Sequence, residues 1–225
     1  MNERSAPLYF YFIRHGETDW NTEKRVQGRE DIPLNGKGRA QAAVLAETLR
    51  PVPFSYVFSS PLSRAYETAR MIAACHPGAK LLTDPLLLER DFGNISGTTA
   101  AEREWFFQNG GHEEVEPVSD VRARVDKALI KMAGFIRQEK AALHSGCSEP
   151  SGPVHAAVVT HGGVIYHLLE MIEEGALEAA VGQVFLHNCD VTVIGEDRSI
   201  LAIDLTTETF PAFWNAFAGR TASEP

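Results

Sequence analysis

The stretch "YFYFIRHGETDWN", residues 9–21, decides how the rest of the chain is read. Its first five residues are apolar without polar alternation, which predicts a strand at 9–13 that is buried on both faces. Arg14 and His15 follow at once, so a cation and an imidazole stand at the end of this strand. In open α/β sheets, ligands bind beyond the carboxyl ends of the strands. We therefore expect a functional site at this junction.

The composition is ordinary for a globular chain and acidic overall. The 225 residues are 44% hydrophobic and 23% charged, with a net charge of −9, which argues against a nucleic-acid partner. No stretch approaches the ~20 apolar residues of a membrane span, and the N-terminus lacks a signal-peptide pattern. Cys75, Cys147 and Cys189 show no CxxC spacing and predict neither a disulfide framework nor the usual zinc site. We expect a cytoplasmic protein without membrane contact.

Strands and helices alternate along the chain, which indicates an α/β layered fold. Ser60 is expected to cap the helix that follows it, with Pro61 at the first helical position. We expect one domain over 1–225, with an exposed loop at 141–153 and a flexible tail at 218–225. The predicted strands cover 9–13, 54–59, 154–160, 183–187, 190–195 and 199–205, and the predicted helices cover 34–50, 60–75, 119–140 and 161–172.

Three of the predicted strand-to-helix junctions carry basic groups. The first delivers Arg14 and His15, the second delivers Arg64 one helical turn on, and the third delivers His161 before two glycines. Two like charges ~4 Å apart repel by about 4 kcal/mol at an effective dielectric constant of ~20. A bound phosphate relieves this repulsion, and the guanidinium fork matches its oxygens. The sequence therefore predicts a phosphate pocket.

The residue types favour phosphoryl transfer without a metal ion. The chain has no GxxxxGK[ST] loop and no Asp-rich cluster, so ATP–magnesium chemistry is not indicated. A neutral imidazole can attack phosphorus and form a covalent phosphohistidine. His15, held between Arg14 and Gly16, is a better candidate for this nucleophile than His161. We expect no metal and no cofactor.

A phosphoryl transfer also needs an acid for the leaving oxygen. Glu89 in "PLLLERDFG" is the candidate, because burial beside the leucines at 86–88 would favour its protonated form. Asp91 and Glu17 are competitors. An ion pair between Glu89 and Arg90 is the structural alternative.

Taken together, "RHGETDWN", "QGREDIPLNGKGRAQA", "SSPLSRAYETA", "LLERDFGNISG" and "VVTHGG" resemble the histidine phosphatase superfamily of phosphoglycerate-mutase-like proteins, in that family's order. The resemblance spans roughly residues 8–165. It implies a three-layer α/β/α sandwich around a mainly parallel sheet, and a metal-free mechanism. It also implies a role for each matching residue: His15 as nucleophile, Glu89 as proton donor, Arg14, Arg64, Asn21 and His161 on the phosphate, and Gln27, Gly28 and Gly162 beside it.

The segment after Glu89 departs from the family pattern. "NISG" stands where the family often has Trp-Glu-Gly, and Pro117 stands where serine is usual, so the substrate-side wall is not predicted. Residues 98–150 are expected to form a substrate lid, a helix and an exposed loop. From Thr98 to Asp120 the chain has one arginine and six carboxylates. An acidic lid with Trp105 to Phe107 favours a less charged organic phosphate, although these aromatics could instead be core contacts.

Three functions follow, in this order. The first is a phosphomonoester hydrolase that acts on a small phosphorylated metabolite. The second is a 2,3-bisphosphoglycerate-dependent phosphoglycerate mutase, which needs more basic side chains than this segment offers. The third is an inactive binding module, which the retention of both His15 and Glu89 disfavours. The sequence fixes neither the substrate nor the oligomeric state, and a homodimer stays open.

Overall fold

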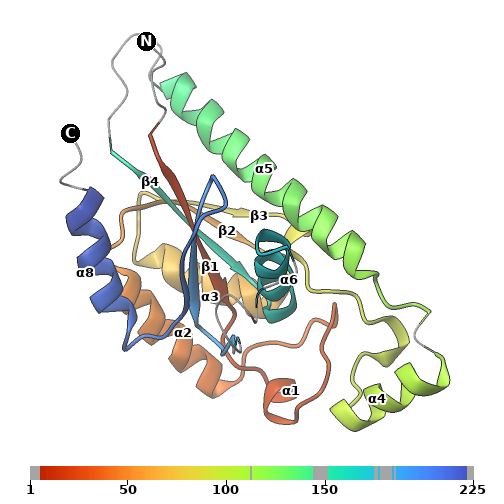
Figure 1. Ribbon diagram of the computed structural model, residues 1–225. Helices are drawn as coiled ribbons and strands as arrows, with labels where there is room; N and C mark the ends of the chain where they lie inside the picture. Colours follow the sequence, from red (N-terminus) through yellow and green to blue (C-terminus); the bar gives the residue numbers. More distant parts are fainter. Residues whose placement is uncertain are drawn as a thin grey trace.

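The computed structural model describes residues 6–111, 113–143, 152–174, 177, 184 and 186–221. Its centre is a six-stranded sheet with the strand order β3-β2-β4-β1-β5-β6 (Figure 1). β1 to β4 run parallel, whereas β5 is antiparallel to β1 and β6 is antiparallel to β5, so the sheet is mainly parallel as predicted. The strands are β1 (Leu8–Arg14), β2 (Phe54–Ser59), β3 (Lys80–Thr83), β4 (Val154–Thr160), β5 (Val191–Gly195) and β6 (Ile200–Leu205).

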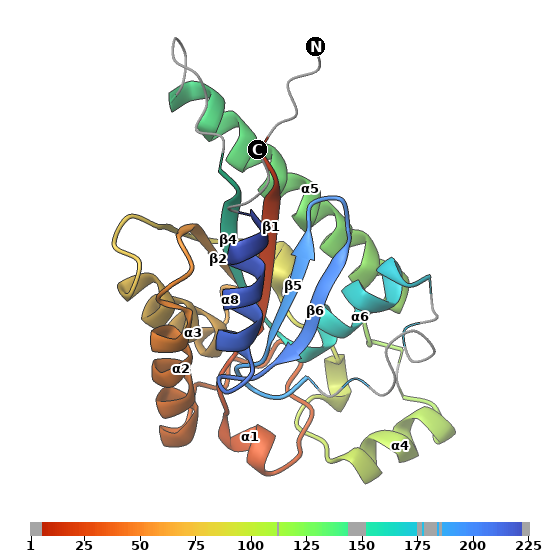
Figure 2. The same cartoon turned by 60° about the vertical axis from the view of Figure 1, so that its left-hand side comes forward.

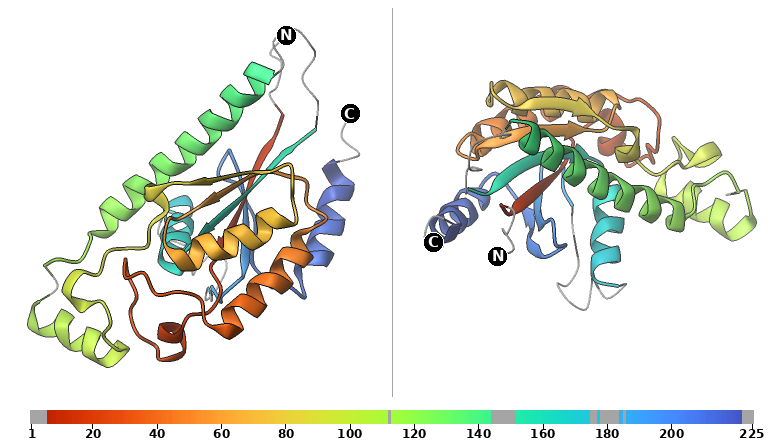
Figure 3. Two further views of the ribbon diagram at one scale, coloured as in Figure 1. Left: turned by 180° about the vertical axis from the view of Figure 1, so that it is seen from behind. Right: turned by 90° about the horizontal axis from the view of Figure 1, so that it is seen from above.

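Helices cover both faces of this sheet (Figures 2 and 3). One face packs against α5 (Val118–Leu143) and α6 (Gly162–Ile172). The other face packs against α2 (Gly36–Leu49), α3 (Ser63–Ala74) and α8 (Phe210–Thr221). The chain therefore forms the three-layer α/β/α sandwich that the resemblance implies.

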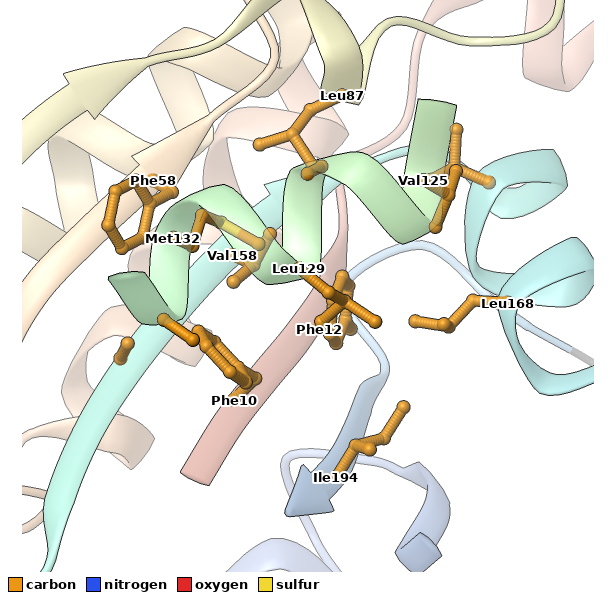
Figure 4. Packing of buried hydrophobic residues seen from close by; sticks show 14 of the residues in the cluster. Phe10, Phe12, Phe58, Leu87, Val125, Leu129, Met132, Val158, Leu168 and Ile194 are labelled. Carbon is orange, nitrogen blue, oxygen red and sulfur yellow. The ribbon is translucent and has the colours of Figure 1, made fainter. Parts of the chain in front are cut away.

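The apolar run of β1 serves both layers, which explains its lack of alternation. Successive strand residues point to opposite faces. Phe10 and Phe12 enter the core beneath α5, beside Leu129 and Met132 (Figure 4). Tyr11 and Ile13 enter the core beneath α2 and α3. All four β1 side chains are at most 1% exposed, so the strand end that carries Arg14 and His15 is held rigidly.

Several local predictions need correction. α3 begins at Ser63 with Leu62 as its N-cap, so Ser60 does not cap this helix and Pro61 precedes it. Tyr66 follows the helical spacing of the buried residues Ala65, Ala69 and Ile72, which predicts burial, yet it is 38% exposed. Short helices that the sequence did not predict occur at α1 (Asp19–Thr22), η1 (Pro85–Leu87), η2 (Gly93–Ile95) and α4 (Ala100–Asn109), and β3 was also not predicted.

Other predictions lie partly outside the described residues. Of the predicted strand 183–187, only 184, 186 and 187 are described, and none of them is in a strand. The predicted loop begins within α5, which extends to Leu143, and 144–151 are not described. The predicted tail begins within α8, which extends to Thr221. No helix in the described part of the chain is long and apolar enough to span a membrane.

Candidate active site

The carboxyl ends of β1, β2 and β4 border a cavity of about 530 Å³. This edge of the sheet is where parallel strands present their ligand-binding loops. His161 does not line the cavity; it is fully buried behind it, with its ring centroid 5.2 Å from that of His15. The other predicted site residues all line the cavity: Arg14, His15, Asn21, Gln27, Gly28, Arg64, Glu89 and Gly162.

His15 is a neutral imidazole with a defined tautomer. Its Nδ1 lies 2.7 Å from the carbonyl oxygen of Gly16. Because a carbonyl oxygen can only accept, Nδ1 carries the proton and Nε2 keeps the lone pair. Burial, together with the charges of Arg64 and Arg14, lowers the pKa of His15 well below its ordinary value. The imidazole is therefore neutral and can attack through Nε2.

Gly16 is required by close packing between β1 and α2. A Cβ on Gly16 would lie 2.5 Å from the carbonyl oxygen of Gly38, and a Cβ on Gly38 would lie 2.0 Å from that of Glu17. Two backbones thus meet where a side chain cannot fit. The Gly16 N–H donates to Thr68 Oγ1 at 3.2 Å, which fixes the turn after His15.

Arg64 is fully buried and donates three hydrogen bonds. Its Nε donates to His15 Nε2 at 3.2 Å, and its Nη atoms donate to the carbonyl oxygens of Glu30 (2.6 Å) and Gly28 (2.8 Å). Gly28, at φ +52°, thus orients the arginine through its backbone. Burial lowers the pKa of Arg64 to about 10, although the charge of Glu89 opposes this change. The guanidinium remains charged at neutral pH.

Two buried nitrogen atoms next to His15 have no partner within the described residues: Arg14 Nε and His161 Nδ1. Buried polar groups are normally hydrogen-bonded, so such atoms need an explanation. Arg14 Nη1 donates to the Leu186 carbonyl oxygen, and His161 Nε2 lies 2.8 Å from Ser60 Oγ. Burial, then the Arg64 charge, lowers the pKa of His161 well below its ordinary value. An anion at this position would satisfy both nitrogens.

Two amide side chains present their N–H groups to the cavity. Asn21 Oδ1 accepts from the N–H and the hydroxyl of Thr18, both at 3.1 Å, while its side-chain nitrogen has no partner among the described residues. Gln27 Oε1 lies 3.0 Å from the same hydroxyl. Thr18 is fully buried and N-caps α1. Since the amide oxygens are held on the protein side, the nitrogens face the ligand side.

Glu89 lines the cavity with its carboxyl group held by two backbone N–H groups. Oε1 accepts from Arg90 at 2.8 Å and Oε2 accepts from Gly163 at 3.1 Å. The sequence argument that its leucine neighbours bury this carboxyl is wrong, because Leu87 enters the core while Glu89 is half-buried beside the arginines. A Cβ on Gly163 would lie 2.5 Å from Glu89 Oε1.

The competing carboxyl groups are engaged elsewhere. Asp91 pairs with Arg29 at 3.3 Å, and Glu17 pairs with Lys37 at 2.7 Å. Neither is among the residues that line the cavity. Arg90 lies 5.4 Å from the Phe92 ring centroid, and its Nε donates to the Glu116 carbonyl oxygen, so the predicted Glu89–Arg90 ion pair does not form between these side chains. Glu89 is the carboxyl group at the site.

The mouth of the cavity is basic. Lys24, Arg25 and Arg103 line it, and the side chains of Lys24 and Arg103 form no hydrogen bond or ion pair with another described residue, although both backbone N–H groups are bonded within the chain. Of the described residues between 98 and 120, only Ala100 and Arg103 line the cavity. The carboxylates of the segment 98–120 therefore do not face the site, so they give no reason to expect a less charged substrate. Trp105 is 58% exposed and is no core contact.

The sequence did not predict the residues that hydrogen-bond to the site residues without lining the cavity themselves. Thr18, Ser60 and Asn188 each contact a predicted site residue, yet Ser60 was interpreted only as a helix cap. The predicted helix start at Pro61 was also wrong, since α3 begins at Ser63, whose N–H donates to Asp31 Oδ1 at 2.6 Å. Within the described part of the chain, no three His, Cys, Asp or Glu side chains are grouped to hold a metal ion.

The chain matches the model of the histidine phosphatase superfamily (branch 1) over residues 10–209. A probable phosphoglycerate mutase GpmB of Enterobacter sp. (strain 638) is 37% identical over 134 residues, which are 54% of this chain and 61% of that protein. The phosphoglycerate mutase-like protein 4 of Arabidopsis thaliana is 35% identical over 180 residues, which are 73% of this chain and 70% of that protein.

Among solved structures, a mycobacterial glucosyl-3-phosphoglycerate phosphatase complexed with VO3 is similar at a TM-score of 0.70 and 26% identity, covering 88% of this chain and 99% of that one. The family model covers most of the chain, so this chain belongs to the histidine phosphatase superfamily. The relatives bear the names of mutases and of a phosphatase, so the family includes both reactions.

Proposed function

We propose that the protein is a metal-independent phosphomonoester hydrolase that works through a phosphohistidine on His15. The observation that carries this proposal is the tautomer of His15, whose Nδ1–H is anchored on Gly16 while Nε2 holds a lone pair beside Arg64. A substrate phosphoryl group would replace His15 Nε2 as acceptor of the Arg64 Nε–H and so free the lone pair. The anchored Nδ1–H then supports the positive charge that develops on the ring.

The reaction has two steps. In the first, His15 Nε2 attacks phosphorus, an N–P bond forms, the P–O bond to the alcohol breaks, and Glu89 donates its proton to the leaving oxygen. In the second, water attacks phosphorus, the N–P bond breaks, and the Glu89 carboxylate takes a proton from that water. The sum is a phosphomonoester plus water giving an alcohol plus inorganic phosphate.

The surrounding groups supply charge that the transferring oxygens need. Arg14 Nε and His161 Nδ1 are buried near His15 and have no partner among the described residues, and the Asn21 amide adds N–H donors from α1. Gly162 lines the cavity at the start of the 11-residue helix α6, where the helix dipole favours an anion. Donors fixed before the reaction stabilise the transition state more than mobile ones, and removal of one such donor typically slows a reaction by about 10²–10³.

A phosphoglycerate mutase is the second candidate, and the basic mouth of the cavity favours it. Lys24, Arg25 and Arg103 could hold a second acidic group of a substrate or of a bisphosphate. The assay that separates the two functions measures phosphate release from a panel of phosphomonoesters, with 3-phosphoglycerate and 2,3-bisphosphoglycerate run alongside for isomerisation. Phosphate release without isomerisation supports the hydrolase, and efficient isomerisation that depends on the bisphosphate overturns it.

Two arginine variants sharpen this assay. Arg103→Ala should raise the KM of esters that carry a second acid and leave that of p-nitrophenyl phosphate unchanged, because only the former reach the mouth of the cavity. Arg70→Ala is the matched control, since Arg70 is exposed on α3 and is not among the residues that line the cavity. An equal effect of both variants on all esters would mean that Arg103 acts only through net charge.

A further inference from the structure

The loop from His187 to Asp190 is hydrogen-bonded to the backbone of Arg14 and His15. The Cys189 N–H donates to the carbonyl oxygen of Arg14 at 2.9 Å. The Arg14 N–H donates to the carbonyl oxygen of Asp190 at 3.2 Å. Cys189 has a left-handed backbone with φ +67°, which is uncommon outside glycine. This turn directs the side chain of Asn188 towards the nucleophile.

Asn188 contacts two residues of the site without lining the cavity itself. Its Nδ2 donates to the carbonyl oxygen of His15 at 2.8 Å and to Oδ1 of Asn21 at 3.3 Å. The first bond holds the backbone of the nucleophile. The second joins the loop before β5 to α1, which are 167 residues apart in the sequence. Asn188 lies instead on a separate cavity of about 400 Å³, together with Lys37 and Thr207.

The second bond, together with those from Thr18, fixes which end of the Asn21 amide faces the ligand. Oδ1 of Asn21 has three donors around it, two from Thr18 and one from Asn188. The hydroxyl proton of Thr18 is also within reach of Gln27 Oε1, at 3.0 Å, so it serves one amide oxygen at a time. When that proton turns to Gln27, two donors remain on Asn21 Oδ1, the Thr18 N–H and Asn188 Nδ2. An Asn21 amide turned the other way would present its oxygen to a phosphate and repel it.

We propose that Asn188 is a positioning residue for phosphate binding, which acts by fixing the amide orientation of Asn21 and the backbone of His15. This inference rests on the proposed phosphate site. Asn188 touches no reacting atom. It keeps the N–H donors of Asn21 directed at the phosphoryl group through its own bond to Asn21 Oδ1.

The test is the Asn188→Asp variant, which keeps the shape and replaces the donor by an acceptor. At pH 8 the new carboxylate faces two oxygens, so Asn21 is expected to turn its N–H groups towards it. Affinity for inorganic phosphate, measured by titration calorimetry on the full chain, should then fall by about tenfold or more, as expected for loss of hydrogen bonds to a charged ligand. Near pH 4.5 the aspartic acid is partly protonated and can donate again. The loss relative to the wild type at the same pH should then shrink to less than about threefold.

Two further variants separate this role from charge and from general structural damage. Ala40→Asp adds a charge at the rim of the same second cavity without contact to His15 or Asn21, and should change phosphate affinity less than twofold. In an Asn21→Ala background, Asn188→Asp should have a smaller effect than in the wild type, because part of its action passes through Asn21. Thermal unfolding confirms that each variant folds.

The inference would be overturned if Asn188→Asp bound phosphate as tightly as the wild type at pH 8. It would also be overturned if Asn188→Asp lost the same phosphate affinity at both pH values and Ala40→Asp lost as much. Phosphate binding is measured without turnover, so the two proposals can fail separately. A wild type that binds phosphate and hydrolyses no ester would refute the proposed hydrolase alone. A wild type that hydrolyses esters while Asn188→Asp binds phosphate normally would refute the role of Asn188 alone.

Discussion

Replacement of Arg64 by methionine should remove activity while it leaves the ligand-free protein nearly as stable as before. Burial lowers the pKa of Arg64 from 12.5 to about 10. At about 1.4 kcal/mol for each pKa unit, the charged form costs the folded state about 3 kcal/mol at neutral pH. The side chain also makes three hydrogen bonds, each contributing about 1 kcal/mol net. Because these terms oppose each other, Arg64→Met should change the free energy of unfolding by less than about 2 kcal/mol.

Inorganic phosphate should distinguish the two proteins. At 100 times its Kd, a ligand stabilises the folded state by about 2.7 kcal/mol, which raises the Tm of a chain of this size by roughly 5–11 °C. The wild type should show this rise, and Arg64→Met should show less than about a third of it. Thermal unfolding with and without phosphate, at matched ionic strength, measures both effects, with Arg70→Met as the control for an exposed arginine on α3.

Two results would refute this reasoning. If Arg64→Met were stabilised by phosphate as strongly as the wild type, Arg64 would not be part of the anion site. If the variant lost more than about 4 kcal/mol without ligand, the arginine would hold the fold together, and its loss of activity would say nothing about phosphate.

Three other predictions follow from the same geometry. Glu89→Gln should lower kcat by about 10²–10⁴ in steady-state assays, whereas Glu17→Gln, whose carboxyl group pairs with a lysine away from the cavity, should change it less than twofold. Gly163→Ala places a Cβ 2.5 Å from Glu89 Oε1 and should cost at least about tenfold in kcat, whereas a Cβ on Gly162 meets its nearest neighbour only at 3.4 Å and should cost less; equal losses would contradict this. Three buried histidines and the half-buried His167 have lowered pKa values, so the unfolded chain binds more protons between about pH 4 and 6.5, and the free energy of unfolding should rise with pH over that range; denaturant titrations that give equal values at pH 5 and 7 would contradict this.

Much of the fold could be predicted because local patterns and tertiary structure agree. The unbroken apolar run of β1 predicts a strand buried between two layers, and the apolar spacing of α5 predicts a helix packed on the sheet by one face. Six apolar residues recur at helical spacing in α5, and all of them are buried: Val121, Val125, Ala128, Leu129, Met132 and Ile136. The predicted site residues came together for a related reason, since strands that run parallel bring their carboxyl ends to one edge.

The remaining errors occur where contacts between residues far apart in the sequence determine what a side chain does. Ser60 carries the signature of a helix cap, yet its hydroxyl is used by His161, which is 101 residues away. The segment 98–120 is acidic in composition, yet its arginine, Arg103, lines the cavity while its described carboxylates do not, and composition does not give this orientation. Asn188 has no sequence signal, because its role comes from a left-handed turn at Cys189 and two bonds across the fold.

The central claim is that His15 carries the phosphoryl group during turnover. The most direct measurement mixes the protein with a ³²P-labelled phosphomonoester, quenches within milliseconds in base, and locates the label on the chain. We predict a base-stable, acid-labile phosphohistidine on the peptide that contains His15, formed and consumed at rates compatible with kcat, and absent in His15→Asn. Turnover without label on this peptide, or normal turnover by His15→Asn, would contradict the account.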